Sequence, residues 1–85
     1  MAEGGPFRYR PDILEQLVRH GVRPTEHTRP ELVHEFVSDV YRYELRTLRT
    51  RLLARAFPKR EYFDRVVAVR NRYRVIALRP RDWID

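Results

Sequence analysis

The sequence predicts an all-α fold: a small three-helix domain with one long central helix, at about residues 29–56, and an extended C-terminal arm over residues 75–85. The first observation is that apolar residues recur at intervals of three and four through the central stretch, which contains no Gly and, after its first turn, no Pro. The second is the presence of Pro and Gly on both sides of that stretch, where they end helices or start new ones. The third is the length of 85 residues, which suffices for a single domain, 1–85, with a thin core.

The N-terminal part is predicted to be an arm followed by a short helix. Residues 1–10 should be partly mobile, while Phe7 and Tyr9 dock on the body. Pro11 suits a first helical turn. Gly21 can adopt the left-handed conformation that ends a helix, so the first helix is expected to stop there.

A capping box is predicted at the start of the long helix. The Thr28 side chain can accept a hydrogen bond from a free backbone N–H group, and Glu31 follows three residues later. If the helix continues to Ala56 it is roughly 40 Å long, whereas a compact chain of this length is only about 30 Å across. We therefore expect part of the helix to protrude, bend or meet a partner.

The first half of the long helix has two apolar sides, and we expect both to be covered. Leu32, Phe36 and Tyr43 form the smaller side. The main side turns basic at Arg51, so the helix terminus at residues 49–55 should be exposed. The main apolar side consists of Val33, Val37, Val40, Tyr41, Glu44, Leu48 and Leu52.

A third helix is predicted to begin near Pro58, because Pro can start a helix but cannot continue one. Asn71 is a candidate left-handed stop for this helix. The segment after it has no helical flank, and Pro80 keeps Arg79 extended. We expect an extended arm that lays Trp83 on the bundle, and a strand there would have nothing to pair with inside the chain.

Charge is distributed unevenly along the chain. Residues 1–45 carry six Arg and eight carboxylates, whereas residues 46–85 carry eleven Arg, one Lys and four carboxylates. A basic half of this kind indicates a polyanionic partner, because clustered guanidinium groups attract phosphate. Coding bias in a GC-rich genome would explain Arg in place of Lys, but it would not explain the excess of basic over acidic residues.

The composition also indicates a cytoplasmic protein. Cysteine is absent, which excludes disulfides, thiolate metal sites and cysteine nucleophiles. No segment approaches the roughly 20 apolar residues of a membrane span. A membrane surface is not an expected partner either, because carboxylates are spread through the first half of the long helix.

Catalysis is not expected, and neither are a cofactor, a bound metal or a small-molecule substrate. The single Ser, Ser38, lies on a predicted helix, and the His residues have no evident nucleophile to serve. Glu31 and His34 have the Glu-x-x-His spacing of helical di-iron sites, but such a site needs two of these motifs. We interpret both residues as surface residues.

Glu44 is unusual because it lies within the main apolar side. We expect a structural ion pair with an Arg of the third helix, such as Arg70, and a functional carboxylate is the alternative. Tyr41 and Tyr73 are interpreted as core residues with hydroxyls at the rim. Trp83 is interpreted as a hydrophobic clamp and not as a platform for base stacking.

The leading hypothesis is a small basic non-enzymatic protein that binds nucleic acid or belongs to a ribonucleoprotein. Helix-turn-helix and zinc-finger patterns are absent, so binding should be dominated by phosphate contacts. The predicted nucleic-acid-binding residues are Arg46, Arg49, Arg51, Arg55, Lys59 and Arg60, with Arg70, Arg72 and Arg74 as a second patch.

The alternative is a protein–protein interaction module or an accessory subunit of a larger assembly, with self-association included. In that case the long helix offers an apolar surface rimmed by Arg residues. The predicted partner-binding residues are Leu48, Leu52, Leu53 and Phe57.

The junction between the last two helices is the predicted centre of the binding site. A connection this short makes the helices antiparallel or sharply angled. Arg51, Arg55, Lys59 and Arg60 then crowd at one corner, with only Glu61 and Asp64 close by in sequence. Such crowding is unfavourable unless an anion shares the site.

Overall fold

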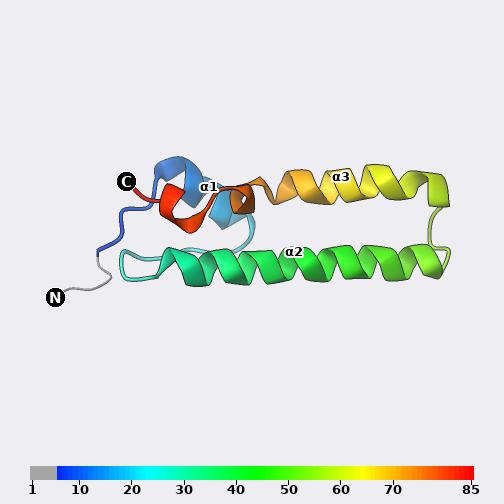
Figure 1. Cartoon of the computed structure of the whole chain (residues 1–85), viewed down its shortest axis with the longest axis horizontal. Helices are drawn as coiled ribbons and strands as arrows, with labels where there is room; N and C mark the ends of the chain where they lie inside the picture. Colours follow the sequence, from blue (N-terminus) through cyan, green and yellow to red (C-terminus); the bar gives the residue numbers. More distant parts are fainter. Residues whose placement is uncertain (1–5) are drawn as a thin grey trace.

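The computed structural model describes residues 6–85 and shows an elongated helical hairpin that is thickened at one end. Helix α2 (Pro30–Leu53) and helix α3 (Tyr62–Arg72) lie side by side and antiparallel (Figure 1). Helix α1 (Pro11–Arg19) and the C-terminal segment pack at the end opposite the hairpin turn. The all-α prediction is confirmed, and the predicted mobility of the first residues concerns positions 1–5, which lie outside the described residues.

The N-terminal arm docks on the body, as predicted. The Phe7 backbone N–H donates to the Glu26 carbonyl at 2.7 Å. Tyr9 is buried, and its hydroxyl donates to the Thr28 carbonyl at 2.6 Å. Burial, together with the negative charge of Glu31, raises the pKa of Tyr9 to about 12.

Helix α1 begins and ends where the sequence indicates. Pro11 is its first residue, and Asp12 lies in its first turn, where a carboxylate suits the positive end of the helix. Gly21 has a φ of 77°, and the Val22 N–H donates to the Leu17 carbonyl at 3.0 Å. The left-handed stop at Gly21 is therefore confirmed.

The start and end of α2 differ from the prediction. The helix begins at Pro30 with Arg29 as its cap, and no side chain caps it. The Thr28 hydroxyl oxygen instead accepts the Thr25 N–H at 2.9 Å within the preceding turn, so the predicted capping box is wrong. The helix ends at Leu53 and not at Ala56, because the chain turns there to meet α3.

The C-terminal segment lies on the body but is not extended throughout. It contains two 3-10 helices, η2 (Arg74–Ala77) and η3 (Pro80–Asp82). Asn71 lies inside α3 and is not a left-handed stop. These turns let Trp83 reach the interior, where it is fully buried and its indole N–H donates to the Val75 carbonyl at 3.1 Å. The interpretation of Trp83 as a clamp is confirmed.

Two long-range contacts hold this segment in place. Tyr9 and Ile84 form an isolated antiparallel bridge, so the end of the chain does find a partner in the N-terminal arm. His34 is half-buried, and its Nε2–H donates to the carbonyls of Ile76 and Leu78, each at 3.0 Å. His34 therefore links α2 to the C-terminal segment and is not a plain surface residue. Within residues 6–85, no three His, Cys, Asp or Glu side chains are placed to bind a metal together.

The core runs from the thick end into the hairpin, and it leaves one side of α2 open. Leu32, Phe36 and Tyr43 are 59%, 55% and 62% exposed, so the prediction that this side is covered is wrong. Helix α1 and the C-terminal segment both pack on the side of α2 that faces α3. The buried core consists of Tyr9, Ile13, Leu17, Val33, Val37, Leu48, Phe57, Val69, Tyr73, Val75 and Trp83.

Among the helices of residues 6–85, none combines the length and the apolar character needed to cross a membrane.

Candidate nucleic-acid interface

The turn between α2 and α3 begins with a helix C-terminal motif in which Arg occupies the position where Gly is usual. Arg55 has a φ of 59°. Its N–H donates to the Leu52 carbonyl at 3.0 Å, and the Ala56 N–H donates to the Arg51 carbonyl at 2.9 Å. These two bonds form a Schellman motif, which satisfies carbonyls at the end of α2. The left-handed residue of this motif is normally Gly, because a Cβ atom is strained there.

After this stop, two residues fix the path of the chain into α3. Phe57 is buried in the core, and Pro58 precedes a 3-10 helix, η1 (Lys59–Glu61), that leads directly into α3. The Arg65 guanidinium lies over the Phe57 ring at 4.3 Å and pairs with Glu61 at 3.0 Å. The turn is therefore anchored from the α3 side.

Four cations are brought together at this turn, as the sequence predicts, and we call them the basic tip: Arg51, Arg55, Lys59 and Arg60. All four side chains are exposed. Within residues 6–85, none of them lies within ion-pair distance of a carboxylate. Glu61, one of the two acidic neighbours in sequence, is already paired with Arg65. The partial negative charge at the C-terminal end of α2 attracts these cations, but it stabilises each of them by only a few tenths of a kcal/mol.

The other predicted phosphate ligands on α2 extend the basic surface away from the tip. Arg46 and Arg49 are exposed on α2. Arg42, one turn earlier, is paired with Asp39 at 2.5 Å. The free cationic surface of α2 therefore begins after Arg42 and continues to the tip.

The second predicted patch lies elsewhere. Arg70, Arg72 and Arg74 are at the C-terminal end of α3, which is the end remote from the hairpin turn (Figure 1). Arg70 and Arg74 are exposed. Arg72 pairs with Glu44 at 2.5 Å, so part of its charge is already compensated. The structure does not join this patch to the basic tip.

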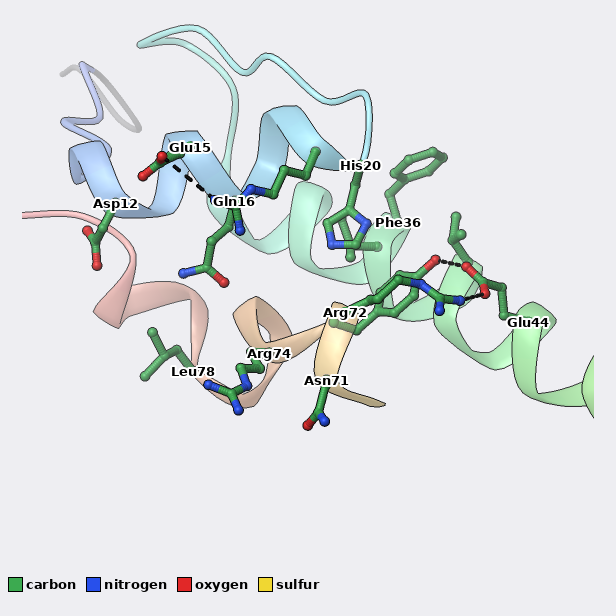
Figure 2. Close-up of a pocket in the computed structure, with 14 residues that line it drawn as sticks. Asp12, Glu15, Gln16, His20, Phe36, Glu44, Asn71, Arg72, Arg74 and Leu78 are labelled. Atoms are coloured by element: carbon green, nitrogen blue, oxygen red, sulfur yellow. Dashed lines mark hydrogen bonds and ion pairs between the residues drawn. The ribbon is translucent and has the colours of Figure 1, made fainter. Parts of the chain in front are cut away.

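A groove of about 910 Å³ lies beside the second patch, between α1, α2 and the end of α3 (Figure 2). It is lined on one side by Glu44, whose carboxylate accepts hydrogen bonds from Arg72 and from the Tyr73 hydroxyl. The His20 ring stacks on Tyr73 with a centroid separation of 4.4 Å. The expected ion pair between Glu44 and an Arg of the last helix is present, but its partner is Arg72 and not Arg70.

The pKa values of the Glu44–Tyr73 pair move in opposite directions. Partial burial opposes ionisation of Glu44, but the hydrogen bonds from Tyr73 and Arg72 outweigh it and lower the pKa of the carboxyl group. Burial and the hydrogen bond to Glu44 raise the pKa of Tyr73 to about 12. The pair is therefore a carboxylate with a neutral phenol at neutral pH, which is an arrangement that joins α2 to α3.

The predicted partner-binding residues are mostly inside the molecule. Leu48 and Phe57 are core residues, and Leu52 is half-buried. Leu53 alone of this group is exposed, at 73%. A continuous apolar surface made of these four side chains is therefore not present, because the packing of α3 on α2 covers most of it.

Sequence reasoning missed the aromatic stack at the groove and the open apolar side of α2. No local signal pairs His20 with Tyr73, since the two residues are distant in sequence. For the open side a signal did exist, because the short α1 has few apolar residues to offer and cannot cover two faces of a longer helix.

Comparisons with protein-family models, curated proteins and solved structures found no match to this chain. Its function is therefore inferred from its own side chains and their geometry.

Proposed function

We propose that this chain is a small non-enzymatic nucleic-acid-binding protein, or a component of a ribonucleoprotein, that holds backbone phosphates at the basic tip. The proposal includes no cofactor, metal or small-molecule substrate, and it places the protein in the cytoplasm. Arg46 and Arg49 continue the phosphate-binding surface along α2.

The observation that supports the proposal best is the uncompensated charge of the tip. Four exposed cations surround one turn, with no carboxylate of residues 6–85 at ion-pair distance. Mutual repulsion at such a corner is relieved when a polyanion binds. Guanidinium groups also offer two parallel N–H donors that match the oxygens of a phosphate.

Binding should depend on phosphates and not on base sequence. Asn and Gln, which read adenine edges, are absent from residues 46–65. Among the aromatic side chains near the turn, Phe57 is buried and Tyr62 is half-buried, whereas Phe63 is exposed. A base stacked on Phe63 would add affinity without reading sequence, because every base has a ring face to stack. We therefore expect contacts that position the nucleic acid without specifying its sequence.

The test is a titration of the full chain with duplex and single-stranded DNA and RNA at low salt. Four phosphate contacts predict a slope of log K against log salt of about −3.6 for duplex DNA. The double variant Arg51→Glu/Arg55→Glu should lose binding by at least about tenfold and flatten the slope by about 2, with unchanged helical circular dichroism.

The matched control is Arg8→Glu/Arg23→Glu. Both residues are exposed and unpaired within residues 6–85, and this variant changes the net charge by the same amount. It should bind nearly as well as the wild type. If both variants lost affinity equally, the net charge and not the basic tip would be responsible for binding. Wild-type binding that is absent or independent of salt would refute the proposal.

The alternative function, a protein-interaction module that uses Leu48, Leu52, Leu53 and Phe57, has less support. Leu48 and Phe57 are already covered by the chain's own packing. A partner that needed them would have to separate α3 from α2.

A further inference from the structure

The side of α2 that faces away from α3 carries a coiled-coil pattern. Seven residues follow one another at alternating intervals of four and three, and all seven are exposed. This 3.5-residue repeat places them on one seam of the helix, the position that a second helix occupies in a coiled coil. We call them the outer seam of α2: Leu32, Phe36, Asp39, Tyr43, Arg46, Thr50 and Leu53.

The outer seam holds four of the seven large apolar side chains that are exposed in residues 6–85. Leu32, Phe36, Tyr43 and Leu53 are between 55% and 73% exposed. In residues 6–85, the other large exposed apolar side chains are Val18, Phe63 and Leu78, which lie on other elements. Figure 1 shows no element along the side of α2 opposite α3. Phe36 lies at the edge of this side and also lines the groove between α1, α2 and the end of α3 (Figure 2). Four exposed apolar side chains on one seam, separated by Asp39, Arg46 and Thr50, mark an interaction surface.

The distribution of charge on α2 identifies the occupant. Glu31, Glu35 and Asp39 precede the midpoint of the helix, and Arg46 and Arg49 follow it. A parallel second copy in register would set Asp39 against Asp39 and Arg46 against Arg46 within the seam, and both contacts are repulsive. An antiparallel second copy would set the acidic half of each helix against the basic half of the other.

We propose that a second copy of this chain packs antiparallel on the outer seam of α2, so that the protein forms a symmetric dimer. The pairing that matches the seam best joins positions whose numbers sum to 89. In it Phe36 meets Leu53 of the second copy, Asp39 meets Thr50, and Tyr43 meets Arg46. Each contact joins chemically compatible groups: two apolar side chains, a carboxylate with a hydroxyl donor, and a phenol ring with a guanidinium.

Neighbouring registers match less well. A shift of one heptad in one direction would set Phe36 against Arg46 and Leu32 against Thr50, which places apolar side chains on polar ones. The opposite shift would leave Phe36 and Asp39 without a partner in α2 of the second copy. Polar residues inside a coiled-coil seam are a known means of selecting register and orientation. Asp39, Arg46 and Thr50 have that role in this dimer.

Residues beside the seam act in both directions. Asp39 comes near Arg49 of the second copy, which favours the antiparallel arrangement. Arg42 comes near Arg49 of the second copy, which opposes it, although Arg42 is already paired with Asp39 at 2.5 Å. A dimer of moderate affinity is therefore expected.

The first experiment is light scattering or sedimentation of the full chain without nucleic acid over a wide range of concentration. The wild type should show a concentration-dependent dimer, and Phe36→Glu should weaken it at least about tenfold. The matched control is Phe63→Glu, because Phe63 is the same residue type on α3 and is even more exposed, at 72% against 55% for Phe36. The control should leave the dimer within about twofold of the wild type. A wild type that stays monomeric throughout, or equal losses in both variants, would overturn the proposal.

The second experiment tests orientation and uses the absence of cysteine from the chain. A mixture of the Phe36→Cys and Leu53→Cys variants should form the mixed disulfide in clear excess over random pairing, because those positions adjoin in the antiparallel dimer. Predominant Phe36→Cys homodimers would instead indicate a parallel arrangement and overturn this register. Neither experiment involves a polyanion, so its failure is distinguishable from failure of nucleic-acid binding.

Discussion

At Arg55 the backbone has a conformation that favours Gly, with a φ of 59°. A Cβ atom in this region crowds the following carbonyl, which costs about 1 kcal/mol. Gly21 performs the same task at the end of α1, with a φ of 77°, and has no such strain. Arg55 therefore combines backbone strain with an exposed positive charge at the tip, where the proposed phosphate binding would use that charge.

Replacing Arg55 by Gly should stabilise the protein by about 0.5–1 kcal/mol, because the strain at the Cβ atom is relieved. Urea denaturation of the wild type and the variant measures the difference. Arg55→Ala is the control, since it removes the same charge but keeps the Cβ atom, and its stability should rise by less than that of Arg55→Gly. If Arg55→Ala and Arg55→Gly were equally stabilised, charge repulsion and not backbone strain would be the cause.

At the scale of the elements, α2 and α3 are joined by a polar link near one end of their contact and by apolar packing along the rest. Glu44 of α2 accepts hydrogen bonds from Arg72 of α3 and from Tyr73 directly after it. Val69 and Leu48 supply buried apolar packing between the same helices. The polar link responds to pH, whereas the apolar packing does not.

Glu44→Gln should lower stability at neutral pH by about 1 kcal/mol, the worth of a partly exposed charged hydrogen-bond pair. The pKa of Glu44 is lowered in the folded state, so its contribution is present above the ordinary value of 4.5 and disappears as pH falls through the folded pKa. The wild type should therefore lose its advantage over Glu44→Gln in acid. Urea denaturation across this pH range measures the convergence.

The control for this prediction is Glu35→Gln, an exposed carboxylate on the same helix. Its stability difference from the wild type should be small at every pH. The pKa of Tyr73 is shifted in the opposite direction, upward to about 12. The contribution of Tyr73 to folding stability is therefore complete below the ordinary pKa of 10.0 and is lost as pH rises towards 12. A pH profile of Glu44→Gln parallel to that of the wild type would contradict the assignment.

At the scale of the whole molecule, the chain is a rod and not a sphere. Its extents are 54 × 19 × 19 Å, and its radius of gyration is 15.7 Å, whereas a compact domain of this length has a radius of about 12 Å. The 24 residues of α2 account for roughly 36 Å of the length. The thick end contains most of the core, so the tip extends away from it on two helices only.

Small-angle scattering of the Phe36→Glu variant, at a concentration low enough to dissociate the proposed dimer, should give a longest dimension near 54 Å and a radius of gyration near 15.7 Å. The elongation follows from the helical hairpin and does not depend on any partner. A radius close to about 12 Å would mean that the hairpin folds back on the thick end.

The candidate site was predictable in part. The exposure of the helix terminus at residues 49–55 follows from an apolar side that turns basic, and the crowding of Arg51, Arg55, Lys59 and Arg60 follows from the short connection. Arg70, Arg72 and Arg74 were predicted as a second patch, but the place of that patch on the molecule was not predicted. It results from the antiparallel course of α3, which carries these residues to the far end of the hairpin.

The sequence by itself determined the helices and the left-handed stop at Gly21, because helical periodicity, Pro and Gly act on the backbone within a few residues. Only the tertiary structure decided how those elements meet: which Arg pairs with Glu44, which hydrogen bonds replace the Thr28 cap, and which side of α2 stays open. Such choices depend on contacts between residues far apart in the chain. Many pairings of similar energy satisfy the same local pattern, and the packing of the whole molecule selects among them.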